Sequence, residues 1–156
     1  MRYAILGNSG SGKSTLARKL SAEHGIEALD LDTIAWASAK PPTLRPTEDA
    51  ALDVRAFCDS HEGWIVEGCY ADLIAASFAS EPELLFLDPG LERCQEHCRA
   101  RPFEPHKYAT REEQDANLAF LLDWVAEYYT RDGDLSHARH LELFESYRGP
   151  KRRITD

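Results

Sequence analysis

The chain has 156 residues, of which 43% are hydrophobic and 29% charged, and its formal net charge is −9 at pH 7. This size and composition predict one globular domain, residues 1–156, with a hydrophobic core of its own. No apolar run approaches the roughly 20 residues that span a membrane. The acidic charge makes nucleic acid an unexpected partner, since binding to nucleic acid depends on neutralised phosphates.

Strand-like and helix-like segments alternate along the sequence. Strands are expected at residues 3–6, 26–32, 63–68, 83–88 and 151–155. Helices are expected at residues 13–24, 48–61, 71–78, 90–101, 110–131 and 135–147, with Thr47 as a helix cap and a proline-rich loop at 38–46. Alternation with nearly all-apolar strands predicts an α/β fold of three layers, in which helices cover both faces of a parallel sheet of about five strands.

The segment GNSGSGKST, residues 7–15, lies between the first strand and the first helix. Its spacing fits G-x-x-x-x-G-K-[ST], the phosphate-binding P-loop. Glycines allow the backbone to curl so that successive N–H groups face an anion, and the helix that follows adds its positive end. We therefore expect the nucleotide phosphates to be held by Gly7, Asn8, Ser9, Gly10, Ser11, Gly12, Lys13, Ser14 and Thr15.

Two residues of this segment have expected chemical roles beyond the backbone cradle. Lys13 can reach the β- and γ-phosphates, and the Ser14 hydroxyl can ligate Mg²⁺. ATP and Mg²⁺ are therefore the expected cofactors. Because the first strand begins at the N-terminus and leaves no room for a signal peptide, we expect the protein in the cytoplasm, where both are plentiful.

Carboxylates stand near the ends of three expected strands, at the edge where ligands bind in such sheets. Asp30 and Asp32 alternate along one strand, so they point to the same side and could orient an acceptor hydroxyl or take its proton; turn formation is the other interpretation. Glu67 and Asp88 each end an apolar strand, as a metal-side carboxylate should, and the pattern alone slightly favours Asp88.

The loop near residues 99–111 carries cations between two helices, at Arg99, Arg101, Lys107 and Arg111. Cations on a mobile segment can cover a triphosphate and stabilise the charge that develops during phosphoryl transfer. We assign this role to Arg99 and Arg101; a solvated basic loop is the alternative. Nearby, Cys94, His97 and Cys98 have helical spacing, but helix packing is favoured over a metal site because no second ligand cluster is present.

The P-loop, the segment Leu31-Asp32 followed by Trp36, then WIVEGCY (64–70) and FLD (86–88) together resemble the small P-loop kinases of the adenylate-kinase and shikimate-kinase superfamily. Among these, the chain is most similar to bacterial adenylate-kinase-like proteins labelled as DNA topology modulation proteins. The resemblance implies an acceptor-binding segment near residues 32–62 and a lid near 99–111. It also moves the choice of metal-side acid to Glu67 and implies that Asp30 serves the metal.

The sequence also departs from this superfamily. The glycine triplet with which shikimate kinases hold their substrate is absent, and EGCYAD (67–72) replaces the Gly-Phe-Pro-Arg stretch of adenylate kinases. The expected function is transfer of the ATP γ-phosphate to a small-molecule acceptor: a hydroxyl metabolite, a nucleoside or a nucleoside monophosphate. Asp32 would position that acceptor. The alternatives are an NTPase or nucleotide-binding regulator without such an acceptor, and a nucleic-acid-associated protein; the sequence does not indicate an oligomeric state.

Overall fold

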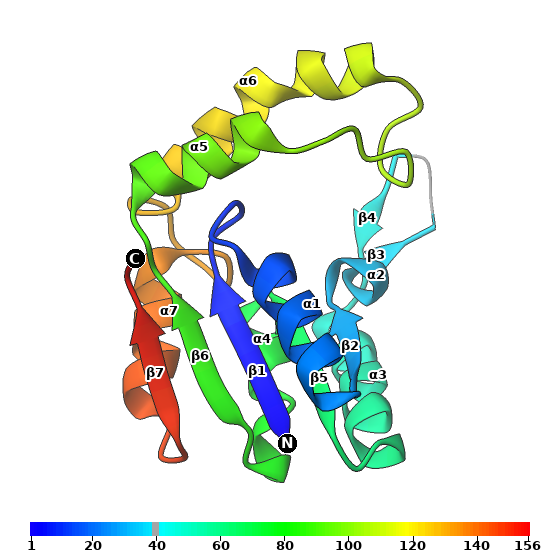
Figure 1. The fold of residues 1–156 in the computed structure, drawn as a ribbon, viewed down its shortest axis with the longest axis vertical. Helices are drawn as coiled ribbons and strands as arrows, with labels where there is room; N and C mark the ends of the chain where they lie inside the picture. Colours follow the sequence, from blue (N-terminus) through cyan, green and yellow to red (C-terminus); the bar gives the residue numbers. More distant parts are fainter. Residues whose placement is uncertain (39–40) are drawn as a thin grey trace.

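The computed structural model of the protein describes residues 1–38 and 41–156. At its centre is a five-stranded sheet with the order β2-β5-β1-β6-β7, in which every neighbouring pair is parallel (Figure 1). The strands are β1 (Arg2–Gly7), β2 (Glu27–Asp30), β5 (Trp64–Gly68), β6 (Glu83–Leu87) and β7 (Lys151–Ile154). The predicted α/β fold with a parallel sheet of about five strands is confirmed.

Helices cover both faces of the sheet. In β1, Tyr3 and Ile5 pack with α1 (Lys13–His24) on one face, whereas Ala4 and Leu6 join the larger core on the other face. Side chains alternate between faces along a strand, so a strand buried on both sides must be apolar at every position. The helices that cover the larger core are α3 (Thr47–Ser60), α4 (Ala71–Ala75) and α7 (His137–Ser146).

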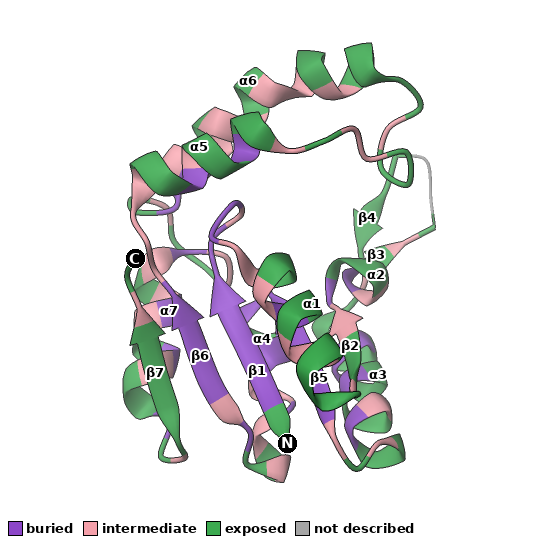
Figure 2. Cartoon of the chain, viewed as in Figure 1, coloured by how far each residue is buried: buried purple, intermediate pink, exposed green. Residues whose placement is uncertain are grey.

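Two further helices, α5 (Leu91–Ala100) and α6 (Arg111–Glu127), form an arm that passes over the carboxyl ends of the strands (Figure 1). They are joined by an apolar seam of Cys94, Cys98 and Val125. Away from this seam α6 is largely exposed (Figure 2). Among residues 1–38 and 41–156, none of the helices has both the length and the apolar character needed to cross a bilayer.

A short hairpin lies beside β2, under the loop that joins the two helices of the arm (Figure 1). It follows α2 (Asp32–Ala35) and consists of β3 (Trp36–Ala37) and β4 (Thr43–Leu44), which pair antiparallel. The predicted loop at 38–46 therefore contains a strand, and its residues 39 and 40 lie outside the described part of the chain.

Several predicted boundaries were wrong, each for a local reason. The strand expected at 26–32 ends at Asp30, because the Asp30 carboxylate accepts the amide N–H of Asp32 at 2.9 Å and turns the chain into α2. Thr47 is the first residue of α3 and makes no side-chain cap; the carbonyl of Pro46 receives the first helical N–H groups instead. The helix expected at 71–78 ends at Ala75, and a 3₁₀ turn, Phe78–Ser80, follows it.

Candidate active site

The P-loop follows β1 directly, and its backbone needs glycine at specific positions. Gly10 and Gly12 have φ angles of 78° and 98°, a region that L side chains rarely adopt. Gly7 has an ordinary φ, but a Cβ there would lie 2.6 Å from the carbonyl oxygen of Leu87. The loop is therefore tightly curled and packed against the end of β6, as a backbone cradle requires.

Hydrogen-bond donors of the loop suit a phosphate group. The amides of the first turn of α1 have no partner within the helix, because a helix leaves its first N–H groups unpaired. The buried Ser11 Oγ has no hydrogen-bond partner among the described residues, and its hydroxyl can donate to a phosphate oxygen. Lys13 Nζ donates to the carbonyl oxygen of Asn8 at 2.7 Å, which keeps its charge beside the loop.

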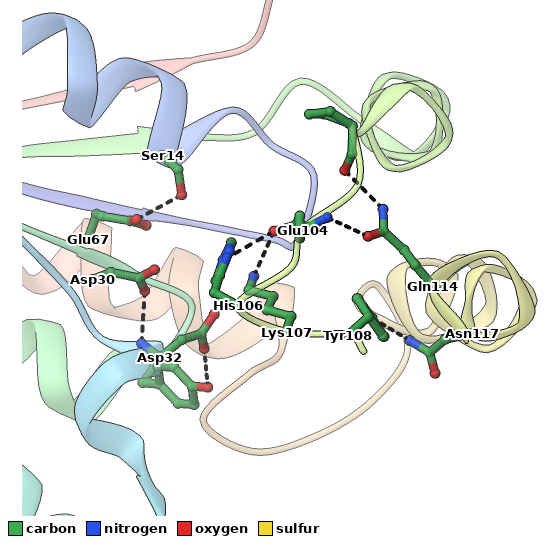
Figure 3. A network of polar contacts seen from close by, with 12 residues as sticks. Ser14, Asp30, Asp32, Glu67, Glu104, His106, Lys107, Tyr108, Gln114 and Asn117 are labelled. Atoms are coloured by element: carbon green, nitrogen blue, oxygen red, sulfur yellow. Dashed lines mark hydrogen bonds and ion pairs between the residues drawn. The ribbon is translucent and has the colours of Figure 1, made fainter. Parts of the chain in front are cut away.

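Glu67 lies at the end of β5 beside the start of α1. Its Oε1 accepts a hydrogen bond from the Ser14 hydroxyl at 2.8 Å (Figure 3). The side chain is only 4% exposed, and burial raises its pKa, against the opposing field of Lys13. Burial also raises the pKa of neighbouring Asp30, whose negative charge in turn acts on Glu67. A cation would relieve this crowding of buried carboxylates.

These oxygens fit Mg²⁺ in number and type. Magnesium prefers oxygen ligands and usually keeps several waters, so one or two carboxylates and a hydroxyl are enough when phosphates supply the rest. Ser14, Glu67 and Asp30 provide such a set. In the described part of the chain no three His, Cys, Asp or Glu residues gather as a cage that would hold a metal without a nucleotide.

Asp88, which the strand pattern slightly favoured over Glu67, lies at the end of β6 and has other partners. Its Oδ2 accepts from Arg153 at 2.6 Å and lies 3.0 Å from His137 Nε2. Burial alone would raise the pKa of Asp88, but the hydrogen bonds from Arg153 and His137 outweigh it, so the pKa is lowered. The geometry thus favours Glu67 as the carboxylate beside the P-loop hydroxyl.

Asp32 begins α2 rather than ending a strand, so the predicted strand alternation does not orient it. Its Oδ1 accepts from the Tyr70 hydroxyl at 2.5 Å, and Tyr70 in turn accepts from Trp36 Nε1 at 3.0 Å. Tyr70 and Trp36 were missed as site residues. The motif residues LDxxxW and EGCY contained them, but only the fold shows that the two segments meet.

A cavity of about 340 Å³ opens beside this chain of hydrogen bonds, with Tyr70 on its wall. It lies between the expected acceptor-binding segment, α4, the end of α6 and the chain that follows α6. Its lining combines aliphatic, aromatic and charged side chains, namely Ala35, Leu44, Arg45, Thr47, Ala50, Tyr70, Leu73, Trp124, Arg131, Asp132, Asp134 and Leu135. A largely apolar hollow with a few polar groups is typical of a small-molecule site. Trp124 of α6 lies on its wall.

The cations expected over the phosphates are distributed unevenly. Arg99 is exposed at the end of α5, and the half-buried Arg101 follows it; both line a small hollow of about 30 Å³ between α5 and α6. By contrast, the positive charge of Lys107 lowers the pKa of Asp30, opposing the larger effect of burial. Lys107 is thus the loop cation that the structure places near the strand-end carboxylates (Figure 3).

The loop between α5 and α6 is fixed to α6 by polar contacts (Figure 3). Gln114 accepts the amide N–H of Glu104 at 2.8 Å and donates to the carbonyl of Pro102 at 3.0 Å. Asn117 donates to the Tyr108 hydroxyl at 2.8 Å. Within this framework Lys107 Nζ lies 3.4 Å from the carboxylate of Glu104.

The Cys94, His97 and Cys98 group packs against the P-loop. Both thiols are buried in the α5–α6 seam, and burial raises the pKa of Cys94 to about 11. The His97 ring nitrogen Nδ1 lies 2.6 Å from the carbonyl oxygen of Gly10. The packing interpretation of these residues, favoured from the sequence, agrees with this arrangement.

Comparison with known proteins gives a structural relative rather than a sequence one. No family model matches the chain, and no curated protein matches it. Among solved structures, it is similar to a gluconokinase from Sinorhizobium meliloti 1021, with a TM-score of 0.51 and 18% identity over 99% of this chain and 80% of that chain. The chain has a P-loop kinase fold. In this fold the P-loop, Glu67 and Asp32 share the carboxyl edge of the sheet.

Proposed function

We propose that the protein is a cytoplasmic, ATP- and Mg²⁺-dependent phosphotransferase that moves the γ-phosphate to a hydroxyl group of a small molecule. The observation that carries this proposal is the placement of two polar pairs at one sheet edge. Ser14 and Glu67 form the first pair beside the P-loop, and Asp32 and Tyr70 form the second beside the 340 Å³ cavity. The P-loop and Asp32 lie at the same edge of the sheet, and Tyr70 connects Asp32 to a cavity of small-molecule size, an arrangement that suits phosphoryl transfer.

On the nucleotide side, residues 7–15 bind the phosphates through backbone amides and hydroxyls, and Lys13 neutralises charge on the β- and γ-groups. Ser14, Glu67 and Asp30 would hold the metal or its waters. When bound, Mg²⁺ neutralises charge on the transferring group. Because Glu67 already bonds to Ser14, the protein fixes the positions of these two side chains in advance.

On the acceptor side, Asp32 orients the hydroxyl and accepts its proton. The acceptor oxygen forms a bond to the γ-phosphorus, the bond from that phosphorus to the β-phosphate oxygen breaks, and ADP leaves with the electron pair. Tyr70 donates to Asp32 Oδ1 and thereby leaves the second carboxylate oxygen for the acceptor. A phosphate acceptor needs no such base, so this arrangement supports a hydroxyl acceptor.

We propose that the segment near residues 99–111 acts as the lid, with cations that cover the transferring group. Lys107 joins Arg99 and Arg101 in this role, because its charge already acts on Asp30. Closure would exclude water and bring a further positive charge to the developing negative charge.

The sequence motifs and the fold support membership in the adenylate-kinase and shikimate-kinase superfamily, near the DNA topology modulation proteins. The gluconokinase similarity supports a small-molecule kinase within this fold. The cavity favours transfer to an acceptor over a regulator that only hydrolyses nucleotide, since a regulator needs no second binding site. The net charge of −9 remains unfavourable for a nucleic-acid partner.

The test is ADP release from Mg-ATP in the presence of a panel of nucleosides, nucleoside monophosphates, sugars, polyols and sugar acids, including gluconate. Lys13→Ala provides the blank, and Asp32→Asn removes the proposed base at nearly constant size. We expect acceptor-dependent ADP release from the parent and at least a 100-fold lower kcat for Asp32→Asn, consistent with the usual effect of a positioned base, about 10²–10⁴-fold. Equal turnover of Asp32→Asn and the parent would contradict the assigned role, and nucleotide binding without acceptor-dependent turnover would favour the regulator.

A further inference from the structure

Two arginines line the 340 Å³ cavity, and their electrostatic surroundings differ. Arg45 Nη1 lies 2.6 Å from the carboxylate of Asp53 and also donates to the carbonyl of Ile34 at 2.8 Å. Its charge is therefore compensated within the protein. Arg131 instead donates to two backbone carbonyls, and no carboxylate pairs with it among the described residues.

The Arg131 guanidinium is held firmly in one place. Its Nε donates to the Leu135 carbonyl at 3.0 Å, and its Nη1 donates to the Trp124 carbonyl at 2.6 Å. The guanidinium carbon lies 3.6 Å from the centroid of the Trp124 ring, so the cation stacks on the indole face. Of the five N–H donors that an arginine carries, these bonds use two. The remaining donors are available to a ligand in the cavity.

The nearby carboxylates do not neutralise this cation. Asp134 Oδ1 accepts the amide N–H of Asp72 at 2.7 Å, which directs that side chain toward the start of α4. Asp132 is exposed. Arg131 is half-buried, and burial lowers its pKa against the opposing effects of Cys69, Glu127 and Tyr128. A half-buried guanidinium that makes no ion pair with the described residues is stabilised by an anionic partner.

We propose that Arg131 is the anion-binding residue of the acceptor site and that the acceptor is a hydroxyl-bearing organic anion. This inference rests on the proposed function. The anionic group pairs with Arg131, and the carbon skeleton packs on the aliphatic wall of Leu44, Leu73 and Leu135. A hydroxyl of the same molecule faces Asp32 through the Tyr70 side of the cavity.

The volume of the cavity limits the acceptor to a small molecule. About 340 Å³ lies at the lower end of ligand-pocket volumes, roughly 300–1,000 Å³. The planar guanidinium binds a carboxylate or a phosphate monoester equally well as a forked donor. A hydroxy acid and a sugar or polyol phosphate both combine an anionic group with a hydroxyl group, so both fit the cavity. An experiment must distinguish the two classes.

Binding is measured first, without turnover, on the Lys13→Ala protein, in which phosphate binding at the P-loop is weakened. The probes are matched pairs of gluconate with glucitol, glycerate with glycerol, and glycerol 3-phosphate with glycerol, titrated by calorimetry and by tryptophan fluorescence, since Arg131 stacks on Trp124. We expect an anionic member to bind at least 10-fold more tightly than its neutral partner. Adding Arg131→Gln removes this preference. The control Arg139→Gln retains it, because Arg139 of α7 already pairs with Asp72 of α4.

Turnover with Mg-ATP then separates this inference from the proposed function. For an anionic acceptor, Arg131→Gln is expected to lower kcat/KM by at least 10-fold while the KM for ATP stays unchanged, and Arg139→Gln leaves both unchanged. Equal affinity for anionic and neutral members, no binding of any anion, or no effect of Arg131→Gln overturns the inference. Selective anion binding without ADP release for any acceptor contradicts the proposed transfer but still supports the anion site. Comparison of the carboxylate probes with the phosphate probe identifies which anion is preferred.

Discussion

The side-chain amide of Asn8 in the P-loop donates to the main-chain carbonyl of Val125 in α6, 117 positions along the chain, at 3.1 Å. A second contact joins the same loop to α5, where His97 Nδ1 lies 2.6 Å from the carbonyl oxygen of Gly10. The P-loop is thus supported by both helices of the arm as well as by the sheet. Its conformation depends on how the α5–α6 arm is seated.

His97→Ala is expected to weaken ATP binding, because the Gly10 carbonyl loses the hydrogen bond that holds the P-loop against α5. A hydrogen bond is worth about 1 kcal/mol, so the expected rise in the ATP dissociation constant is about fivefold. Calorimetry with Mg-ATP measures it. Glu96→Ala, an exposed position on the same helix, is the control and should leave the affinity unchanged. An unchanged affinity in His97→Ala would show that the sheet alone fixes the loop.

Gly10→Ala is expected to destabilise the protein more than Gly25→Ala, although both glycines have positive φ angles, 78° and 64°. A Cβ at position 25 meets nothing within 4 Å, so the cost there is the backbone strain alone, about 1 kcal/mol. A Cβ at position 10 would overlap the carbonyl of Cys94 on α5, in addition to the same strain. Urea unfolding of the two variants measures the difference, and equal midpoints would show that the arm shifts without cost.

The fold could be predicted from the sequence because its signals are local and agree with one another. The segments 3–6 and 64–66, around Ile5 and Ile65, are apolar at every position, and the P-loop has a fixed spacing. Boundaries failed where a side chain redirected the backbone. Asp30 looks like part of a strand in sequence, yet its carboxylate bonds to the amide of Asp32 and ends β2.

The site was only partly predictable, since several of its contacts join distant segments. Glu67 could be proposed from a strand end, but its choice over Asp88 depends on which carboxylate meets Ser14 in space. Tyr70 belongs to the WIVEGCY segment, but nothing in the sequence marks its side chain as a site residue, and Arg131 belongs to no motif. They became candidates only when the fold placed them on one cavity.

Glu67→Gln is expected to lower kcat by at least about 100-fold and to raise stability at neutral pH. The activity falls because, under the proposed function, a charge that would hold the metal is removed. The stability rises because burial raises the pKa of Glu67 above its ordinary value of 4.5, so keeping the carboxylate ionised opposes folding at pH 7. The folded protein then binds more protons than the unfolded chain just above pH 4.5, and the parent loses stability as the pH rises through this window.

The measurement is denaturant unfolding of the parent and Glu67→Gln between pH 4 and pH 7, alongside turnover. The advantage of the variant should be largest at neutral pH and shrink as the pH falls to and below the ordinary value of 4.5, because the carboxyl of the parent then loses its charge as well. Glu62→Gln, at an exposed glutamate, serves as the control and should show no such trend. A variant less stable than the parent at pH 7 would mean that the bond to Ser14 outweighs burial.

His140 is expected to make the protein less stable in mild acid. Its Nε2 lies 2.7 Å from the carbonyl of Cys69 and its Nδ1 lies 2.8 Å from the Tyr128 hydroxyl, so the neutral ring donates to the first and accepts from the second. Burial lowers the pKa of His140 to about 4, from 6.5. Between pH 6.5 and pH 4, His140 therefore binds a proton in the unfolded chain but not in the folded protein. The free energy of unfolding falls over this range by about 3 kcal/mol. Denaturant unfolding of the parent and His140→Gln, which cannot titrate, measures the difference; a difference that stays constant between pH 7 and pH 4 would show that His140 is protonated in the folded state.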